Sequence, residues 1–373
     1  MILRAFATAL FAALAIAAAL SAEAKVAEPK VVLVTFDGVR WRDVFRGADQ
    51  ALVDLPQFVH PDIKTELIDP AYVRPADRAA ALMPFLHGII ATQGVVYGNR
   101  DKGECAKVAN DLWFSYPGYN EFLTGHPDPA ITSNDKVANP NVSVLEYLAT
   151  APGFAGHVGM VGTWDVFPYI LNTARSHVPV NAALNGGYPT DVKTDREGLR
   201  LLAQHQRLTY IAFGDTDEFA HAGDYAHYLT ALEHGDDFLR RLWEYLQSDP
   251  YYRGQTTLFV LTDHGRGETP LAAWREHGSP RSYQLTPADA PEYNATGAIG
   301  SDAIWFAAIG PAIVRSAVPP PALSPSPHAV CLLQAQTAAS LLTALGRDWH
   351  DFHPVPGQPQ ITPAPPLPFV MMP

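Results

Sequence analysis

Acidic and histidine residues follow three apolar, β-branched runs of the sequence. Val31–Phe36 ends in Asp37-Gly38, Thr209–Phe213 leads into Asp217-x-x-x-His221, and Thr257–Thr262 ends in Asp263-His264-Gly265. Carboxylate and imidazole groups together are ligands suited to zinc or another divalent metal. Each piece also has an ordinary structural explanation, because Asp-Gly is a common turn and an Asp and a His four residues apart can form a surface ion pair. Their coincidence at three strand ends favours a metal site.

The pattern of apolar residues also indicates which elements position these side chains. Two further runs, His157–Thr163 and Ile304–Ile309, are typical of buried strands. Segments with helical periodicity lie between the runs: Arg78–Ala91, Val142–Ala149 after Asn141 as a cap, Tyr225–Gln247, and Leu332–Leu345. Strands that alternate with helices predict an α/β fold, with a central, mostly parallel sheet flanked by helices on both faces of a single domain. Ligands bind at the carboxyl ends of the strands in such sheets, so the acidic and histidine residues can converge in one crevice.

A candidate nucleophile precedes a short predicted helix. The stretch Phe114–Gly125 predicts a helix with Ser115 as its N-cap, Pro117 in its first turn and Gly125 as its stop. A capping serine is usually only a cap. The same position, however, directs the hydroxyl and the free backbone N–H groups at whatever approaches the helix start, which favours a phosphoryl or sulfuryl group.

These pieces occur in a fixed order along the chain. They are Asp37, Ser115-Tyr116-Pro117 with Leu123-Thr124-Gly125 behind it, Asp217-x-x-x-His221, Asp263-His264, and a later His277-Gly278. In order and spacing they resemble the alkaline phosphatase superfamily, and within it the nucleotide pyrophosphatase/phosphodiesterase (type I phosphodiesterase) branch. The resemblance extends from Val31 to Gly346.

The resemblance implies an alkaline-phosphatase-like fold and two zinc ions (Zn2+), with another divalent metal such as Mn2+ as the alternative. One ion would be held by Asp217, His221 and His277, and the other by Asp37, Asp263, His264 and the Ser115 oxygen. Ser115 would be the nucleophile, and Asn134 in the stretch Ile131–Asn134 would hydrogen-bond to the transferred group. Asn120 is the competing candidate for that hydrogen bond. Asp215 is the alternative to Asp217 as a ligand.

The function that the resemblance implies is an exported di-zinc phosphoric-ester hydrolase that acts by double displacement through a phosphoserine at Ser115. Phosphomonoesterase branches place Lys or Arg over the non-bridging oxygens, whereas the segment Gly162–Pro168 offers aromatics and no cation. This favours phosphodiesters over monoesters, unless Arg100 or Lys102 supplies the charge. The aromatics Trp164, Phe167, Tyr169 and Trp274 could line a pocket, although aromatics in apolar surroundings usually pack in a core.

Other functions compete with this interpretation. A phosphomonoesterase, that is an alkaline phosphatase, would use the same site, and a phosphotransferase would pass the phosphoryl group to an alcohol. A sulfatase is disfavoured because Gly118 and Tyr119 follow Ser115-x-Pro117, without the Arg of the sulfatase signature. A non-catalytic phosphate-binding protein would lack a ligand or the nucleophile, and all of the expected positions are filled.

Composition limits the partners. The 373 residues include 26 Lys+Arg and 38 Asp+Glu, which gives a net charge of -12, so no nucleic-acid-binding surface is expected. With 47% hydrophobic residues the chain can build a large core. The expected partner is a small-molecule phosphate ester. The two cysteines, Cys105 and Cys331, permit one disulfide or two buried free thiols.

The two ends of the sequence differ in composition from the rest of the chain. Residues 1–24 contain Arg4, an apolar run from Ala5 to Leu20 and the pattern Ala22-Glu23-Ala24, which predicts a secretory signal peptide and a periplasmic or secreted protein with no membrane span after cleavage. The alternative is an uncleaved N-terminal anchor. Residues 25–350 would form the catalytic domain, and residues 351–373 a Pro-rich C-terminal tail.

Overall fold

A seven-stranded sheet forms the centre of the protein. The computed structural model describes residues 28–182, 190–286, 290–319 and 331–373, so the predicted signal peptide lies outside the described residues. The strands of the sheet are β1 (Lys30–Phe36), β2 (Val95–Tyr97), β4 (Val158–Gly162), β5 (Val180–Asn181), β6 (Leu208–Phe213), β7 (Thr256–Thr262) and β8 (Phe306–Ile309), in the order β2-β8-β7-β1-β6-β4-β5. The pairs from β7 through β5 are parallel, and β8 runs antiparallel to both of its neighbours. The predicted mostly parallel α/β sheet is confirmed.

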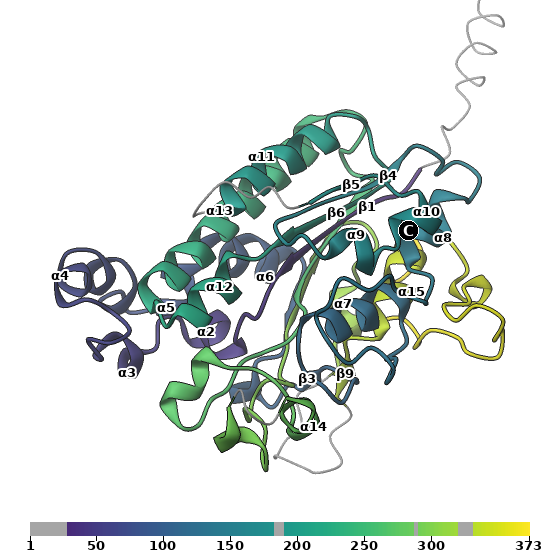
Figure 1. The fold of residues 1–373 in the computed structure, drawn as a ribbon. Coiled ribbons are helices and arrows are strands. Elements are labelled where there is room, and N and C mark those ends of the chain that lie inside the picture. Colours follow the sequence, from purple (N-terminus) through teal and green to yellow (C-terminus); the bar gives the residue numbers. More distant parts are fainter. Residues whose placement is uncertain (1–27, 183–189, 287–289, 320–330) are drawn as a thin grey trace, which may run out of the picture.

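Both faces of the sheet are covered by helices (Figure 1). On one face lie α11 (Asp191–Leu202), α12 (Asp215–Ala222) and α13 (Tyr225–Ser248); on the other lie α7 (Ser115–Thr124), α8 (Val144–Ala149), α9 (Phe167–Ile170) and α15 (Gln336–Ala344). The smaller helices are α2 (Trp41–Arg46), α3 (Gln50–Val53), α4 (Pro61–Ile63), α5 (Arg78–Leu82), α6 (Ala91–Gln93), α10 (Thr173–Ser176) and α14 (Pro280–Leu285), with π-helical segments at Lys64–Val73 and Leu86–Ile90.

The central strand β1 shows how the core is divided. All of its residues are buried, and alternate side chains point to opposite faces of the sheet. Val31 and Leu33 belong to the cluster that contains residues of α7, α8 and α15, while Val32 and Val34 belong to the cluster under α13. Burial on both faces explains why β1, β6 and β7 appear in the sequence as continuous apolar runs without a polar alternation.

Three predicted helices have different bounds in the structure. The predicted helix Arg78–Ala91 is wrong as one element, because α5 ends at Leu82 and Pro84 follows, where a continuing helix would lose a hydrogen bond and clash. Ser143, not Asn141, caps α8, since its side chain accepts from the N–H of Glu146. The predicted helix Leu332–Leu345 begins later, at Gln336, because Leu332 and Leu333 form a strand.

That strand, β9 (Leu332–Leu333), pairs in parallel with β3 (Ala106–Lys107) in a second, two-stranded sheet. A disulfide between Cys105 and Cys331 joins the residues directly before the two strands. Of the two alternatives that the sequence left open, a disulfide or two free thiols, the structure has the disulfide.

The C-terminal residues pack against the domain. Phe352, Leu367 and Phe369 are buried in the cluster that contains α7 and α15. The N–H of Ala364 donates to the carbonyl of Gly125 at the end of α7. In the described part of the chain, no helix combines the length and the apolar character that crossing a bilayer requires.

Candidate functional site

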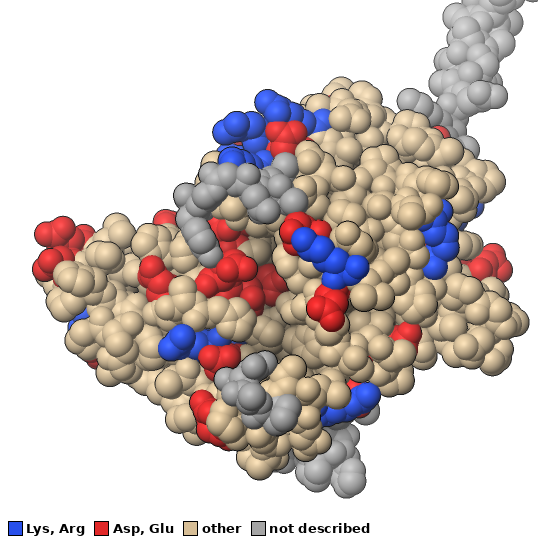
Figure 2. Space-filling model, in the orientation of Figure 1, with Lys and Arg blue, Asp and Glu red and all other residues tan. Residues whose placement is uncertain are grey.

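The strands β7, β1 and β6 are neighbours in the sheet, and their carboxyl ends bring the predicted residues together. Asp37 follows β1, Asp263 and His264 follow β7, and α12, which carries Asp217 and His221, begins just after β6. Figure 2 shows acidic side chains gathered over α12. Two groups of side chains in the described residues have ligand atoms close enough to hold a metal ion: Asp217, His221 and His277, and Asp37, Asp217 and His264.

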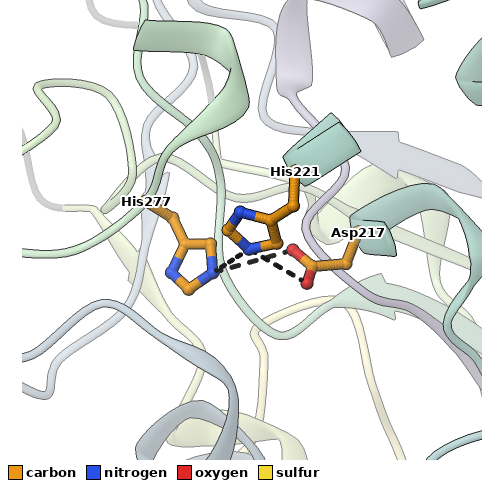
Figure 3. Close-up of side chains that lie close together, drawn as sticks. All are labelled: Asp217, His221 and His277. Atoms are coloured by element: carbon orange, nitrogen blue, oxygen red, sulfur yellow. Dashed lines mark hydrogen bonds and ion pairs between the residues drawn. The ribbon is translucent and has the colours of Figure 1, made fainter. Parts of the chain in front are cut away.

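In the first group, two imidazoles and one carboxylate face one another (Figure 3). The Nε2 atoms of His221 and His277 are 3.0 Å apart, and the distances from these atoms to the Asp217 carboxylate are 3.3 and 3.7 Å. Asp217 and His221 share a face of α12 because they are four residues apart. Burial and the nearby His264 lower the pKa of His277 well below its ordinary value, which favours the neutral imidazole that a metal ligand requires.

The second group is more deeply buried, and the buried Asp263 at the end of β7 adds a further carboxylate to it. The Nε2 atom of His264 lies 3.3 Å from Oδ1 of Asp37 and 3.4 Å from Oδ2 of Asp263. The other carboxylate oxygens are held from behind, since Tyr119 donates to Oδ2 of Asp37 and the N–H of Gly38 donates to Oδ1 of Asp263. Burial lowers the pKa of His264, but Asp263 and Asp37 outweigh it and raise that pKa to about 9.

Two carboxylate oxygens of this second group accept no hydrogen bond among the described residues, although each lies within 3.4 Å of Nε2 of His264. They are Oδ1 of Asp37 and Oδ2 of Asp263, and both are buried. A buried carboxylate oxygen without a partner is costly, and a divalent cation is the usual compensation. Burial and the neighbouring Asp37 raise the pKa of Asp263 well above its ordinary value, which expresses the same crowding of negative charge. The donor sets of both groups therefore fit divalent metals.

Ser115 lies beside the second group. Its hydroxyl oxygen is 3.3 Å from Nε2 of His264, and the residue is buried. The prediction of Ser115 as an N-cap is wrong by one position, because Phe114 has the extended backbone of the cap and Ser115 is the first helical residue. The predicted stop is confirmed, since Gly125 ends α7 with a φ of 72°. Gly118 permits the close packing, because a Cβ there would lie 2.4 Å from the carbonyl oxygen of Asp263.

The two candidate asparagines have different surroundings. Oδ1 of Asn134 accepts a hydrogen bond of 3.0 Å from the N–H of Tyr116, so this exposed side chain lies at the start of α7. Asn120 is fully buried, and its amide contacts His126, Asn139 and Asn141. The structure therefore places Asn134 at the start of α7, next to the residue that follows Ser115, whereas the side chain of Asn120 is bonded within the loop that carries Asn134.

Comparison with known proteins identifies the type of fold. No protein-family model and no curated protein sequence matches the chain. Among solved structures, lipoteichoic acid synthase LtaP from Listeria monocytogenes is 9% identical and superposes with a TM-score of 0.53 over 90% of this chain and 76% of that chain. Ps i-CgsB is 14% identical, with a TM-score of 0.50 over 86% of this chain and 72% of its own. The chain has an alkaline-phosphatase-like fold.

A protein in the alkaline phosphatase superfamily from Vibrio parahaemolyticus also matches, at 12% identity, with a TM-score of 0.47 over 86% of this chain and 67% of that chain. At these identities the likeness concerns the fold and leaves the reaction open. The expected alkaline-phosphatase-like sheet is confirmed by the strand order and by the superposition on LtaP.

The other sequence candidates occupy defined places in this alkaline-phosphatase-like domain. Asp215 faces the start of α11, where it accepts from the hydroxyl of Thr190 at 2.6 Å and from the N–H of Asp191 at 3.2 Å, so it is engaged away from the metal groups. Arg100 and Lys102 are exposed on a 3-10 turn. Of the aromatics, Phe167 and Trp274 are core residues, Tyr169 is exposed, and Trp164 packs against Tyr119 with ring centroids 6.1 Å apart.

Two residues of the site were missed by the sequence analysis. Tyr119 lies one helical turn beyond Ser115 and donates to Asp37. Arg266, directly after Asp263-His264-Gly265, forms a buried ion pair with Asp217. The spacing from Ser115 could have indicated Tyr119. Arg266 follows the strand-end motif directly, and an arginine at this position could equally lie exposed in a loop. The local sequence therefore does not predict that it is buried.

Proposed function

We propose that this chain is an exported di-zinc phosphoric-ester hydrolase that uses Ser115 as its nucleophile and prefers phosphodiesters to monoesters. The observation that carries the proposal is the position of the Ser115 hydroxyl, which lies 3.3 Å from Nε2 of His264 beside the unpartnered carboxylate oxygens of Asp37 and Asp263. A hydroxyl at the start of a ten-residue helix, next to a cation site, is well placed to attack phosphorus.

The residues that would hold one metal are Asp217, His221 and His277. Those that would hold the other are Asp37, His264 and the Ser115 oxygen, together with Asp263, whose carboxylate lies 3.4 Å from Nε2 of His264. When bound, such a pair lowers the pKa of the serine hydroxyl and stabilises negative charge on the attacking and departing oxygens. Tyr119 and the N–H of Gly38 keep Asp37 and Asp263 oriented by occupying their remaining oxygens.

The reaction would proceed in two displacements. The Ser115 oxygen forms a bond to phosphorus while the bond from phosphorus to the departing alcohol breaks, which leaves a phosphoserine. Water then attacks the same phosphorus, the bond to Ser115 breaks, and the serine hydroxyl is regenerated. Because Oδ1 of Asn134 is held by the N–H of Tyr116, its amide nitrogen can donate to a non-bridging oxygen.

The preference for diesters rests on the charges near the site. The segment 162–168 has no cation of its own, but Lys136 reaches it and lies 2.6 Å from Asp165. Since Asp165 neutralises Lys136, the additional negative charge of a monoester has no ready partner there. A phosphomonoesterase is the second candidate, because a monoester could draw Lys136 away from this exposed ion pair.

Initial rates on p-nitrophenyl phosphate, bis-p-nitrophenyl phosphate and p-nitrophenyl sulfate test the proposal, with the zinc-loaded wild type, Ser115→Ala and the matched control Ser133→Ala. We expect the diester to be the best substrate and Ser115→Ala to lose about 10³-fold or more in kcat at unchanged metal content. Ser133→Ala, which removes an exposed hydroxyl in the neighbouring loop, should behave as wild type. Unchanged cleavage by Ser115→Ala would exclude the serine mechanism, and a preference for the monoester or the sulfate would replace the diesterase by a phosphatase or a sulfatase.

A further inference from the structure

A buried arginine contacts the only carboxylate of the first metal group. Arg266 is 1% exposed, and its Nη1 atom forms an ion pair with Oδ1 of Asp217. Gly38 makes room for it, because a Cβ at this position, where φ is 62°, would lie 2.5 Å from Nη1 of Arg266.

The same guanidinium also binds the segment that delivers His277. Its Nε atom donates to the carbonyl of Trp274 at 2.8 Å, and its Nη2 atom donates to the carbonyl of Arg275. These carbonyls lie three and two residues before His277. Arg266 therefore joins α12, which carries Asp217, to the 3-10 helix Leu271–Arg275, which ends two residues before His277. Because Arg266 is buried, a substrate could reach its guanidinium only by displacing these contacts.

Arg266 also makes the two metal groups unequal in charge. In the first group, Arg266 balances the negative charge of Asp217, which is the only carboxylate among Asp217, His221 and His277. In the second group, Asp37 and Asp263 contribute two carboxylates, which are held by Tyr119, the N–H of Gly38 and His264. Asp217 also lies within reach of Asp37 and His264, but Arg266 offsets its charge there too, so the carboxylates of Asp37 and Asp263 are the difference between the two groups. A divalent cation is repelled by a guanidinium that shares its ligand and attracted by two carboxylates, and the attraction is strengthened in the second group, which is the more deeply buried.

We infer that Arg266 is a positioning residue that holds Asp217 and the His277 segment together and makes the Asp217–His221–His277 group the weaker of the two metal sites. The inference rests on the pair of metal sites in the proposed function. It predicts that the second group, Asp37, Asp263 and His264, fills first.

Titration of the metal-free full chain with zinc, in competition with a chromophoric chelator, tests this directly. We expect two binding constants in the wild type, with the weaker one lost in His221→Ala and the tighter one lost in Asp263→Asn. In Arg266→Met the weaker constant should tighten by about tenfold or more, because the repulsion is removed. Arg266→Lys keeps the charge and should stay within about threefold of the wild type. The matched control is Arg240→Gln, which neutralises an exposed cation that pairs with Asp237 and Glu244 on α13 and should change neither constant.

The positioning role has its own readout, which is the visible absorption spectrum of Co2+ in the first site. Both Arg266→Met and Arg266→Lys lose hydrogen bonds to the Trp274 and Arg275 carbonyls, so both should alter this spectrum. The control Arg240→Gln should not alter it. Unaltered spectra would remove the positioning role.

Two results would overturn the unequal affinities: loss of the tighter constant in His221→Ala, or constants for Arg266→Met within about threefold of the wild type. If circular dichroism shows that Arg266→Met does not fold, His221→Ala and Asp263→Asn still show which site has the weaker constant in the wild type. These titrations do not depend on ester cleavage, so they can fail independently of the proposed function. A protein that cleaves no ester but fills the second group first would support the inference and contradict the proposed function. A protein that cleaves esters but fills the first group first would support the proposed function and contradict the inference.

Discussion

Oδ1 of Asn134 accepts a hydrogen bond from the N–H of Tyr116, the residue that directly follows Ser115. The loop that carries Asn134 is thereby attached to the first turn of the nucleophile helix α7. Because an amide side chain has one acceptor end and one donor end, this bond leaves the NH2 group of Asn134 free to donate. In a phosphoryl-transfer site, such a donor stabilises charge that develops on a non-bridging oxygen.

Asn134→Ala should lower kcat on the preferred ester by about 10²-fold, which is the usual effect of losing one such donor. Asn134→Asp should be at least as inactive, because its carboxylate can still accept from the N–H of Tyr116 but repels an anionic substrate. Steady-state kinetics measure the effect, with the neighbouring Thr132→Ala as the control. A kcat for Asn134→Ala within about twofold of wild type would remove Asn134 from the machinery.

Asn120→Ala should act on the same reaction indirectly. Its loss leaves the side-chain amides of Asn139 and Asn141 without their shared acceptor, so the loop that carries Asn134 loosens. We expect a loss of about 1–3 kcal/mol in the free energy of unfolding, together with a lower kcat. Once Asn134 is already Ala, adding Asn120→Ala should lower the melting temperature further but leave kcat unchanged. Additive losses of kcat in the double variant would mean that Asn120 acts on the substrate independently.

The sequence was sufficient to predict that the candidate metal ligands converge at one edge of the sheet. Asp37, Asp263 and His264 directly follow buried strands, and parallel strands present their carboxyl ends at one edge of the sheet. The position of Asp217 follows from the start of α12 just after β6. His277, in contrast, lies in an irregular segment with no periodicity, and only the resemblance to a family indicated it.

The remaining residues of the site depend on contacts between distant parts of the chain. The choice between Asn120 and Asn134 is made by an amide network within the loop 126–141, which leaves no periodic pattern in the sequence. The burial of Arg266 depends on the path of residues 271–277 around it. The break of the predicted helix 78–91 has a local cause instead. Pro84 interrupts the helix although the helical spacing of apolar residues continues past it.

Removing the disulfide should destabilise the domain. Cys105 and Cys331 are 226 residues apart, so their bond restricts a long loop of the unfolded chain. The double variant Cys105→Ser/Cys331→Ser should lose about 2–4 kcal/mol in the free energy of unfolding, which thermal unfolding with and without a thiol reductant can measure. The reductant should lower the melting temperature of the wild type toward that of the variant, whose own melting temperature should not respond. Equal melting temperatures for both proteins without reductant would show that the bond does not form.

The buried Glu121 of α7 should make stability depend on pH. Its carboxylate accepts from the N–H groups of Ala109, Asn110 and Ala335 and from the side-chain amide of Asn110, and it thereby joins α7 to β3 and β9. Burial raises its pKa from 4.5 to about 7, although these hydrogen bonds oppose the rise. Between these two pKa values the folded state binds more protons than the unfolded state, so the contribution of Glu121 to stability is greatest below pH 4.5 and declines as the pH rises to about 7.

Glu121→Gln should remove this pH dependence at a cost in stability. The glutamine keeps the size of the side chain, but its NH2 group would face the N–H donors of Ala109 and Asn110, which costs about 1–3 kcal/mol. The difference in unfolding free energy between wild type and Glu121→Gln, measured by urea denaturation, should therefore shrink as the pH is raised from 4.5 to about 7. Taking the difference isolates Glu121 from Asp236, whose pKa burial raises to about 6. A difference that stays constant or grows across this range would show that Glu121 remains ionised in the folded protein, with its four donors outweighing its burial.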